Sequence, residues 1–203
     1  MKLYYAPGAC SLAAHIVADE ADLRLQLEKV DLESHRTENG QDYYKVNPKG
    51  YVPTIQLDDG STLTENVAVL NYLADHTGHK LFTPVPGSME HYRLEEWLGF
   101  ITTELHKSFG PFFQGGSVEE RRKAKEKIRI RFAHVDERLK GKPFLMGERM
   151  TVADAYLFVM LTWAKKNNFN LSRFSNLSAF FARMSRRASV QRALKEEGLP
   201  LAA

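Results

Sequence analysis

The sequence predicts a two-part chain in which an α/β domain with the element order βαβ-α-ββα precedes an all-helical domain. Three observations support this prediction. Strand-like and helical patterns alternate up to residue 80, two prolines and a glycine interrupt the chain at "TPVPG" (83–87), and the patterns beyond that point are helical. We therefore expect an α/β domain at 1–80, a linker at 81–87 and a helical domain at 88–203.

The first elements form a βαβ pattern. "KLYYA" at 2–6 has strand character, and the residues at 10–21 place Leu12 and Ile16 on one helical stripe. The run at 25–32 alternates imperfectly, which is enough to predict a second strand that completes the βαβ unit.

A short helix, a hairpin and a longer helix are expected next. "DYYKVNPKG" (42–50) predicts a short helix that ends before Pro48, because proline disfavours the α conformation in the preceding residue. "TIQL" and "STLT" flank an Asp-Asp-Gly turn and predict an antiparallel hairpin. "ENVAVLNYLADHTG" (65–78) spaces its apolar residues helically, and Gly78 suits a left-handed cap.

Helical patterns fill the second domain. Residues 88–113 form a long amphipathic segment, and 118–140 form a charge-rich one whose "IRIRF" alternation lacks the turn signals of a strand. "TVAD" (151–154) opens an apolar helix with a capping-box pattern, and two shorter helices are expected within 175–198.

Composition excludes several classes of protein. The hydrophobic content of 43% suits a globular core, and no run approaches the roughly 18 apolar residues of a membrane span. Pro7, Gly8 and His15 interrupt the apolar N-terminal stretch, so we expect no signal peptide. The net charge of +3 is too small to imply nucleic acid. The single cysteine excludes an internal disulfide and predicts a cytoplasmic protein.

Cys10 is the first candidate functional residue. It follows a Pro-Gly turn at the expected start of a helix, where unpaired N–H groups and the helix dipole favour a thiolate. A thiol with a pKa of ~8.5 is only about 3% ionised at pH 7, whereas a pKa two units lower would ionise roughly three quarters of it. The alternative is an inert buried cysteine. Because Ala13 follows three residues later, a mixed disulfide would need an external thiol to resolve it.

"VPT" (52–54) and "TEN" (64–66) are two further candidate motifs. A cis Val52–Pro53 bond would turn the preceding carbonyl and amide towards a peptide-like ligand, and a trans proline at a strand start is the ordinary alternative. The first amides of the helix after "TEN" suit a carboxylate, and a plain N-cap is the alternative there.

A polar stripe is predicted in the second domain. At about 100° per residue, Gly99, Thr103 and His106 share one helical face, away from the apolar face. The alternative for His106 is an exposed surface histidine. No metal site is expected.

These features together resemble the glutathione transferases, and within them the bacterial beta class. Five segments carry the resemblance in order over almost the whole chain: "YYAPGACSLAAHI", "VNPKGYVPTI", "LTENVAVLNYLAD", "EEWLGFITTELHKSF" and "TVADAYLF". The resemblance implies a thioredoxin-like first domain, a homodimer, and glutathione as the co-substrate that is joined to a small hydrophobic electrophile. It also implies thiol-disulfide exchange or peroxidase side activity through a mixed disulfide of Cys10 with glutathione.

The resemblance also assigns roles to individual residues. Cys10 and His106 would be catalytic, with Cys10 beside the sulfur of glutathione. Relatives often have asparagine where this chain has Gly99, so either one glutathione contact or one wall of the electrophile site is expected to be absent. The implied glutathione contacts are Cys10, the backbone of Val52 at the cysteinyl part, Glu65 and Asn66 at the γ-glutamyl end, His35 near the glycine end, and Thr103, His106 and Lys107 from the helical domain. Thr151 and Asp154 resemble a folding signature.

A non-catalytic binding or scaffold protein of the same fold is the alternative, because a fold does not fix a function. The basic run from Arg121 to Lys142 would then bind a nucleic acid or an acidic partner. Acids are mixed into that run and no aromatic series accompanies it, so we expect a solvated helix face and no nucleic-acid or membrane partner.

Overall fold

The computed structural model describes residues 1–76 and 84–200, which form two compact units. The first unit comprises 1–76 together with 185–200, and the second comprises 84–184. This division differs from the predicted helical domain of 88–203, because the last helix of the chain packs on the first one. The predicted cap at Gly78 and the first three linker positions lie outside the described residues.

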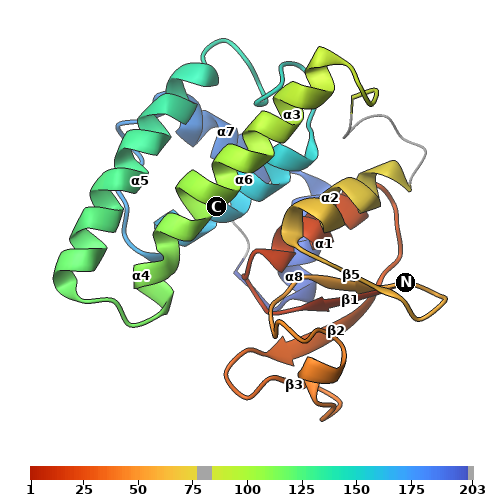
Figure 1. Cartoon of the computed structure of the whole chain (residues 1–203). Helices are drawn as coiled ribbons and strands as arrows, with labels where there is room; N and C mark the ends of the chain where they lie inside the picture. The colour runs from red at the N-terminus through yellow and green to blue at the C-terminus, as the bar shows by residue number, and fades with distance from the viewer. Residues whose placement is uncertain (77–83, 201–203) are drawn as a thin grey trace. The chain divides into compact units, whose positions relative to one another are not determined.

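The first unit is built on a five-stranded sheet of order β3-β2-β1-β4-β5 (Figure 1). β1 (Lys2–Tyr5) pairs in parallel with β2 (Gln26–Asp31) and antiparallel with β4 (Thr54–Gln56), which pairs in turn with β5 (Thr62–Thr64). The predicted βαβ unit and hairpin are therefore confirmed. The two-residue β3 (Arg36–Thr37) was not predicted, because it lies in a polar stretch without alternation.

Helices complete the first unit. α1 (Ser11–Glu20) packs against α2 (Asn66–Asp75) beside the sheet and also against α8 (Ala188–Glu196), while the predicted short helix is a 3-10 turn, η1 (Tyr43–Lys45) (Figure 1). α1 is buried at every position from Ser11 to Ala18. A helix with neighbours on several sides is apolar nearly all round, which explains why its sequence stripe is weak.

α3 (Met89–Phe100), α5 (Val118–Arg138), α6 (Val152–Lys166) and most of α7 (Ser175–Ser185) form the second unit. α6 is buried over most of its length and is the core helix of this unit. In the described part of the chain, no helix is both long and apolar enough to cross a membrane.

The predicted capping box of α6 is confirmed. The buried Asp154 carboxylate accepts hydrogen bonds from the N–H of Thr151 at 2.8 Å, from its hydroxyl at 2.9 Å, and from the N–H of Leu145 at 2.8 Å. Asp154 therefore satisfies the start of α6 and also fixes the preceding loop.

The predicted continuous segment 88–113 changes helix type three times. After α3 the chain forms a π-helical turn (η2, Ile101–Leu105), a 3-10 turn (η3, His106–Phe109) and a short helix (α4, Gly110–Phe113). Hydroxyl groups within this segment donate to carbonyls four residues earlier, which competes with a regular backbone ladder. The polar stripe of Gly99, Thr103 and His106 was predicted with a constant rotation of about 100° per residue. That assumption is wrong, because the backbone geometry changes within the segment: Thr103 is exposed, whereas His106 is partly buried.

Candidate functional site

Cys10 is the N-cap residue of α1, as the sequence predicts. Its Sγ donates a hydrogen bond to the carbonyl oxygen of Val52 at 3.3 Å. The Ser11 hydroxyl lies 3.2 Å from the backbone nitrogen of Ala6 and 3.3 Å from its carbonyl oxygen. These contacts join the first residue of α1 to Ala6, at the other end of the loop that carries Cys10. Gly8 in that loop has φ +70°, a conformation that side chains disfavour.

The protonation state of Cys10 differs from the prediction. Burial raises the pKa of Cys10 to about 12, while hydrogen bonds from the backbone of Cys10 and Ser11 lower it by less and the charge of Glu65 raises it further. Desolvation therefore outweighs the helix N-terminus that the sequence pointed to. At neutral pH Cys10 is a neutral thiol that acts as a hydrogen-bond donor.

The Val52–Pro53 bond is cis, one of the two alternatives that the sequence left open. Two buried side chains hold the residues around it. The hydroxyl of Tyr43 bonds the carbonyl of Tyr51 and the hydroxyl of Thr54, both at 2.8 Å, and the amide of Asn47 donates to the same two groups at 2.7 and 3.1 Å. The backbone that faces Cys10 is therefore fixed by the core of the unit, a support that sequence analysis missed.

The start of α2 has two features typical of a ligand site. Glu65 has φ +71°, a region that residues with side chains rarely occupy and that recurs at binding sites. Both polar side-chain atoms of Asn66 are buried and have no hydrogen-bond partner among the described residues. Buried polar groups are nearly always paired, so the amide of Asn66 is available to a ligand.

Lys49 is a neighbour of this site that sequence analysis missed. Its Nζ lies 2.5 Å from Oε1 of Glu65 and 2.7 Å from the hydroxyl of Thr64. The pair is exposed, so it places the Glu65 carboxylate without adding much stability.

His35 packs against Tyr44, with ring centroids 4.4 Å apart. Its Nδ1 is buried and finds no hydrogen-bond partner within residues 1–76 and 84–200. A Cβ added at Gly50 would lie 2.8 Å from Tyr44 Cε1 and 3.0 Å from His35 Nδ1, so glycine provides the space for both rings. His35 thus offers an unpaired ring nitrogen in the first unit.

His106 lies in the second unit. Its Nδ1 forms a hydrogen bond with the hydroxyl of Tyr156, and its ring centroid is 4.9 Å from that of Trp163. Burial and the charge of Lys107 lower the pKa of His106 to about 4, so the ring is neutral at neutral pH. The alternative of an exposed surface histidine is wrong.

Aromatic side chains surround this histidine. The Trp163 ring lies 5.5 Å from that of Phe109 and 4.8 Å from that of Phe113, which is 49% exposed. Thr103 and Lys107 are exposed nearby in sequence, and the Thr103 hydroxyl donates to the carbonyl of Gly99 at 3.0 Å. Sequence analysis missed Phe113, because an apolar residue in a helical pattern carries no sign of its exposure.

The structure divides the predicted site residues between the units. Those of the first unit are Cys10, His35, Val52, Glu65 and Asn66, and those of the second are Thr103, His106 and Lys107. Within the first unit, the hydrogen bond of Cys10 to Val52 and the electrostatic effect of Glu65 on Cys10 bring three of the five together.

Comparison with known proteins agrees with both units. The profile "Glutathione S-transferase, N-terminal domain" matches residues 8–76, and "Glutathione S-transferase, C-terminal domain" matches 100–188. Glutathione S-transferase GstA of Escherichia coli O157:H7 is 46% identical over 201 residues, which cover 98% of this chain and 100% of that protein.

Two solved structures extend the match. A beta-class glutathione S-transferase of Sphingomonas chungbukensis is 42% identical with a TM-score of 0.95, and a sphingomonad glutathione S-transferase complexed with glutathione is 41% identical with a TM-score of 0.94. Each alignment covers 98% of this chain and 100% of the other chain. The chain therefore belongs to the glutathione S-transferases, in their bacterial beta class.

Proposed function

We propose that this chain joins the sulfur of glutathione to small apolar electrophiles, with the tripeptide held on the first unit. The observation that carries this proposal is the buried, unpaired amide of Asn66 beside the unusual backbone of Glu65, in the unit where Cys10 meets Val52. A related sphingomonad enzyme is described in complex with glutathione, which supports the choice of ligand.

The chemistry of the tripeptide matches these groups. The carboxylate of Glu65 suits the γ-glutamyl ammonium, while the amide of Asn66 and the first N–H groups of α2 suit its carboxylate. The backbone of Val52 suits the peptide groups of the cysteinyl part. The unpaired ring nitrogen of His35, in the tautomer in which it carries the ring proton, suits the glycine carboxylate as a hydrogen-bond donor.

In this proposal Cys10 acts as a hydrogen-bond donor. Its thiol turns from the Val52 carbonyl to the sulfur of glutathione and stabilises the glutathione thiolate, which lowers the pKa of that thiol. The thiolate then forms a bond to the electrophilic carbon, and the leaving group departs with its bonding electron pair. Cys10 itself is unchanged by this reaction.

Thiol-disulfide exchange is a slower side activity of the same residue. The Cys10 thiolate attacks the glutathione sulfur of a disulfide between glutathione and another thiol, forms the mixed disulfide with glutathione and releases the other thiolate. A glutathione thiolate then attacks this mixed disulfide, restores Cys10 and leaves as glutathione disulfide. A peroxidase side activity would pass through the same mixed disulfide. The pKa of about 12 keeps the attacking thiolate scarce, so exchange is slow at neutral pH.

The second unit supports an apolar electrophile. Trp163 and the half-exposed Phe113 offer aromatic surface next to His106, and aromatic surface binds apolar rings. Because His106 is neutral, it would offer an apolar electrophile on this unit a hydrogen-bonding group rather than a cation. The roles of Thr103 and Lys107 as further glutathione contacts rest on the family resemblance.

We also propose a homodimer that works in the cytoplasm. α3 exposes Met89 (65%) and Tyr92 (58%), large apolar side chains that a second subunit would cover. A reducing compartment keeps both Cys10 and its thiol co-substrate reduced. Light scattering after size-exclusion chromatography tests the dimer, and a monomer at micromolar concentration would exclude it.

Titration calorimetry with glutathione, followed by a conjugation assay with an aryl halide, tests the proposed function. We expect binding of glutathione and turnover of the aryl halide. Binding without turnover of any apolar electrophile would favour the scaffold alternative, and the absence of binding heat across several temperatures would overturn the proposal.

A further inference from the structure

His15 lies on α1, outside the proposed glutathione site, and is only 2% exposed. Both ring nitrogens face carboxylates that the end of the chain supplies. Nδ1 lies 3.2 Å from Oε1 of Glu197, and Nε2 lies 2.9 Å from Oε2 of Glu196. A carboxylate oxygen accepts and does not donate, so both contacts are hydrogen bonds only when both nitrogens carry protons. The geometry is that of an imidazolium held between two acids.

The other charged groups around His15 leave an excess of negative charge. Asp19 lies one turn further along α1, and Arg192 of α8 is 3.5 Å from its Oδ2. The ring of Tyr5 from β1 is 6.3 Å from the ring of His15. Burial lowers the pKa of His15, but the hydrogen bonds and charges of Glu197, Glu196 and Asp19 outweigh it and raise the pKa above its ordinary value near 6.5.

The same acids support the loop that carries Cys10. Oε2 of Glu197 accepts a hydrogen bond from the N–H of Gly8 at 2.8 Å, and the Glu197 side chain is fully buried. The methyl carbons of Leu199 lie 3.6 and 3.7 Å from the position that a Cβ would take at Gly8. Gly8 is two residues before Cys10, so the segment that follows α8 is packed against the turn that places the thiol.

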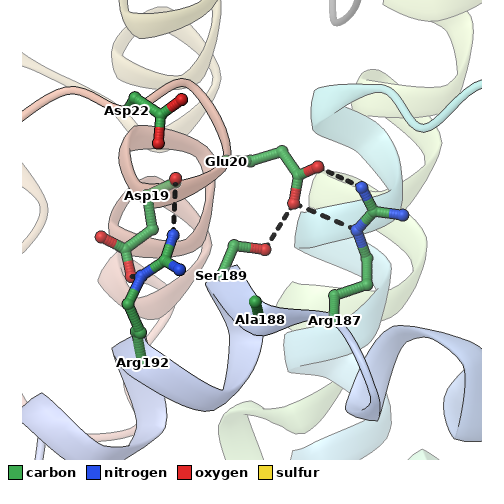
Figure 2. Close-up of a pocket in the computed structure, with 7 residues that line it drawn as sticks. All are labelled: Asp19, Glu20, Asp22, Arg187, Ala188, Ser189 and Arg192. Carbon is green, nitrogen blue, oxygen red and sulfur yellow. Dashed lines mark hydrogen bonds and ion pairs between the residues drawn. The ribbon is translucent and has the colours of Figure 1, made fainter.

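The first half of α8 and its N-cap are attached to α1 by two arginines and a hydroxyl group. Figure 2 shows that the guanidinium of Arg187 and the hydroxyl of Ser189 donate hydrogen bonds to the carboxylate of Glu20. It also shows Arg192 paired with Asp19. These residues line a surface pocket of about 280 Å³ and already pair with one another. Arginine stays protonated across the working pH range, so this end of α8 stays attached when His15 titrates.

We propose that His15 is a positioning residue for the Cys10 loop: its protonated ring clamps Glu196 and Glu197, and loss of the proton releases the end of α8 and weakens the support of Gly8. The inference goes beyond glutathione binding, because it concerns the thiol loop of the free protein. Glu196, half exposed, is the acid that can turn into water. Glu197 is fully buried and stays in place. It then accepts at most one hydrogen bond from the neutral ring, in addition to the one from the N–H of Gly8.

The direction of the pH dependence follows from the raised pKa. The clamp is complete below the unfolded pKa of about 6.5 and is lost as the pH rises through the higher folded pKa. The Cys10 loop should therefore be most rigid in mildly acidic solution and should loosen in alkaline solution.

Alkylation of Cys10 by iodoacetamide, followed by mass spectrometry from pH 5.5 to 9 without glutathione, tests the proposal. Cys10 is the only cysteine, so the adduct that peptide mapping places on Cys10 reports this loop. Dividing each variant rate by the wild-type rate at the same pH removes the intrinsic ionisation of the thiol. We expect His15→Gln to react several-fold faster than wild type in acid and the ratio to fall towards one as the pH rises. Glu137→Gln, a surface acid on α5, is the matched control and should give a ratio of one throughout.

Glu196→Gln keeps the inference testable if His15→Gln does not fold, because it removes an exposed charge and leaves an amide acceptor. The wild-type NMR titration of the His15 ring should have its midpoint above 6.5, and this variant should lower the midpoint. A ratio independent of pH, or an unchanged midpoint, would overturn the proposal. Since no glutathione is present, neither result depends on the proposed conjugation.

Discussion

At the scale of single residues, two asparagines show how burial separates support from recognition. Asn47 is 2% exposed and donates to two partners beside the cis peptide. Asn66 is equally short and polar, yet both of its polar atoms are buried without a partner among the described residues. An unpaired buried amide is costly in the free protein, so its retention points to a group that pairs with it.

We expect Asn66→Ala to raise the Kd for glutathione about tenfold, the equivalent of roughly 1.4 kcal/mol, without lowering the melting temperature. The variant removes donors and acceptors that only the ligand would satisfy. Asn47→Ala is the matched control and should lower the free energy of unfolding by about 1–3 kcal/mol, because it leaves buried partners unpaired. Calorimetry and urea unfolding measure the two effects. Wild-type affinity in Asn66→Ala would remove Asn66 from the site.

Cys10→Ala separates the two reactions proposed for the thiol. Conjugation should fall by no more than about a hundredfold, because a hydrogen bond donated to a charged group such as the glutathione thiolate contributes about 1.5–3 kcal/mol. The mixed disulfide of the protein with glutathione, which forms when glutathione disulfide is added, should disappear from the mass spectrum, since the sequence has no other cysteine. Cys10→Ser retains a donor and should keep more conjugation than the alanine variant. Thiol-disulfide exchange that continues in Cys10→Ala would show that Cys10 is not the thiol that reacts with the disulfide.

Local sequence was enough to select Cys10, Val52, Glu65 and Asn66 as candidates, because each belongs to a short motif at the start or end of an element. It could not give the protonation state of Cys10, since burial of the sulfur depends on the whole unit. His15 and Glu197 are separated by 182 positions, and no local pattern joins them.

At the scale of elements, periodicity identified most helices but not the type of helix. The apolar spacing in 88–113 persists while the backbone passes from α to π to 3-10 geometry. His106 follows the π turn directly, and this places its ring on Tyr156 instead of in water. A pattern that counts residues cannot detect such a change, because one additional residue per turn alters the face of every later side chain.

The start of α6 gives the prediction that belongs to this scale. Asp154→Ala removes a buried carboxylate that accepts from the two N–H groups of Thr151 and Leu145 and from the Thr151 hydroxyl. We expect the free energy of unfolding to fall by about 3 kcal/mol, because each buried N–H left unpaired costs about 1–3 kcal/mol. Thr151→Ser retains the hydroxyl and should change stability by less than about 1 kcal/mol. Urea unfolding measures both, and equal stability of the two variants would contradict this role of the capping box.

At the scale of the whole molecule, the pKa values of two histidines are shifted in opposite directions. The pKa of His106 is lowered to about 4, so the unfolded chain takes up its proton first as the pH falls below about 6.5. That difference destabilises the folded state progressively down to pH 4. His15 has a raised pKa and contributes no such change in this window, because it is protonated in both states below 6.5.

His106→Asn should remove the acid sensitivity that His106 contributes while keeping a hydrogen-bonding group for Tyr156. The stability of wild type relative to this variant should decline between pH 6.5 and 4, by up to about 3 kcal/mol. Chemical unfolding at several pH values gives the difference directly, and carboxylates common to both proteins cancel. A difference that is constant with pH would show that His106 titrates in the folded protein at its ordinary pKa.

The division into units makes the end of the chain part of the first fold. α8 inserts Val190, Ala193 and Leu194 into the first unit with exposures of 0, 0 and 3%. Burial of the two larger side chains contributes about 3–6 kcal/mol, comparable with the whole stability of a small domain. A chain that stops after Met184 should therefore lose the folded first unit, although the deletion begins more than a hundred residues after α2. Limited proteolysis should cut it between residues 1 and 76 while 84–184 stays protected, and Leu194→Ala should show the same pattern only in mild urea. Wild-type protease resistance of the first unit in the shortened chain would show that α8 is not part of its core.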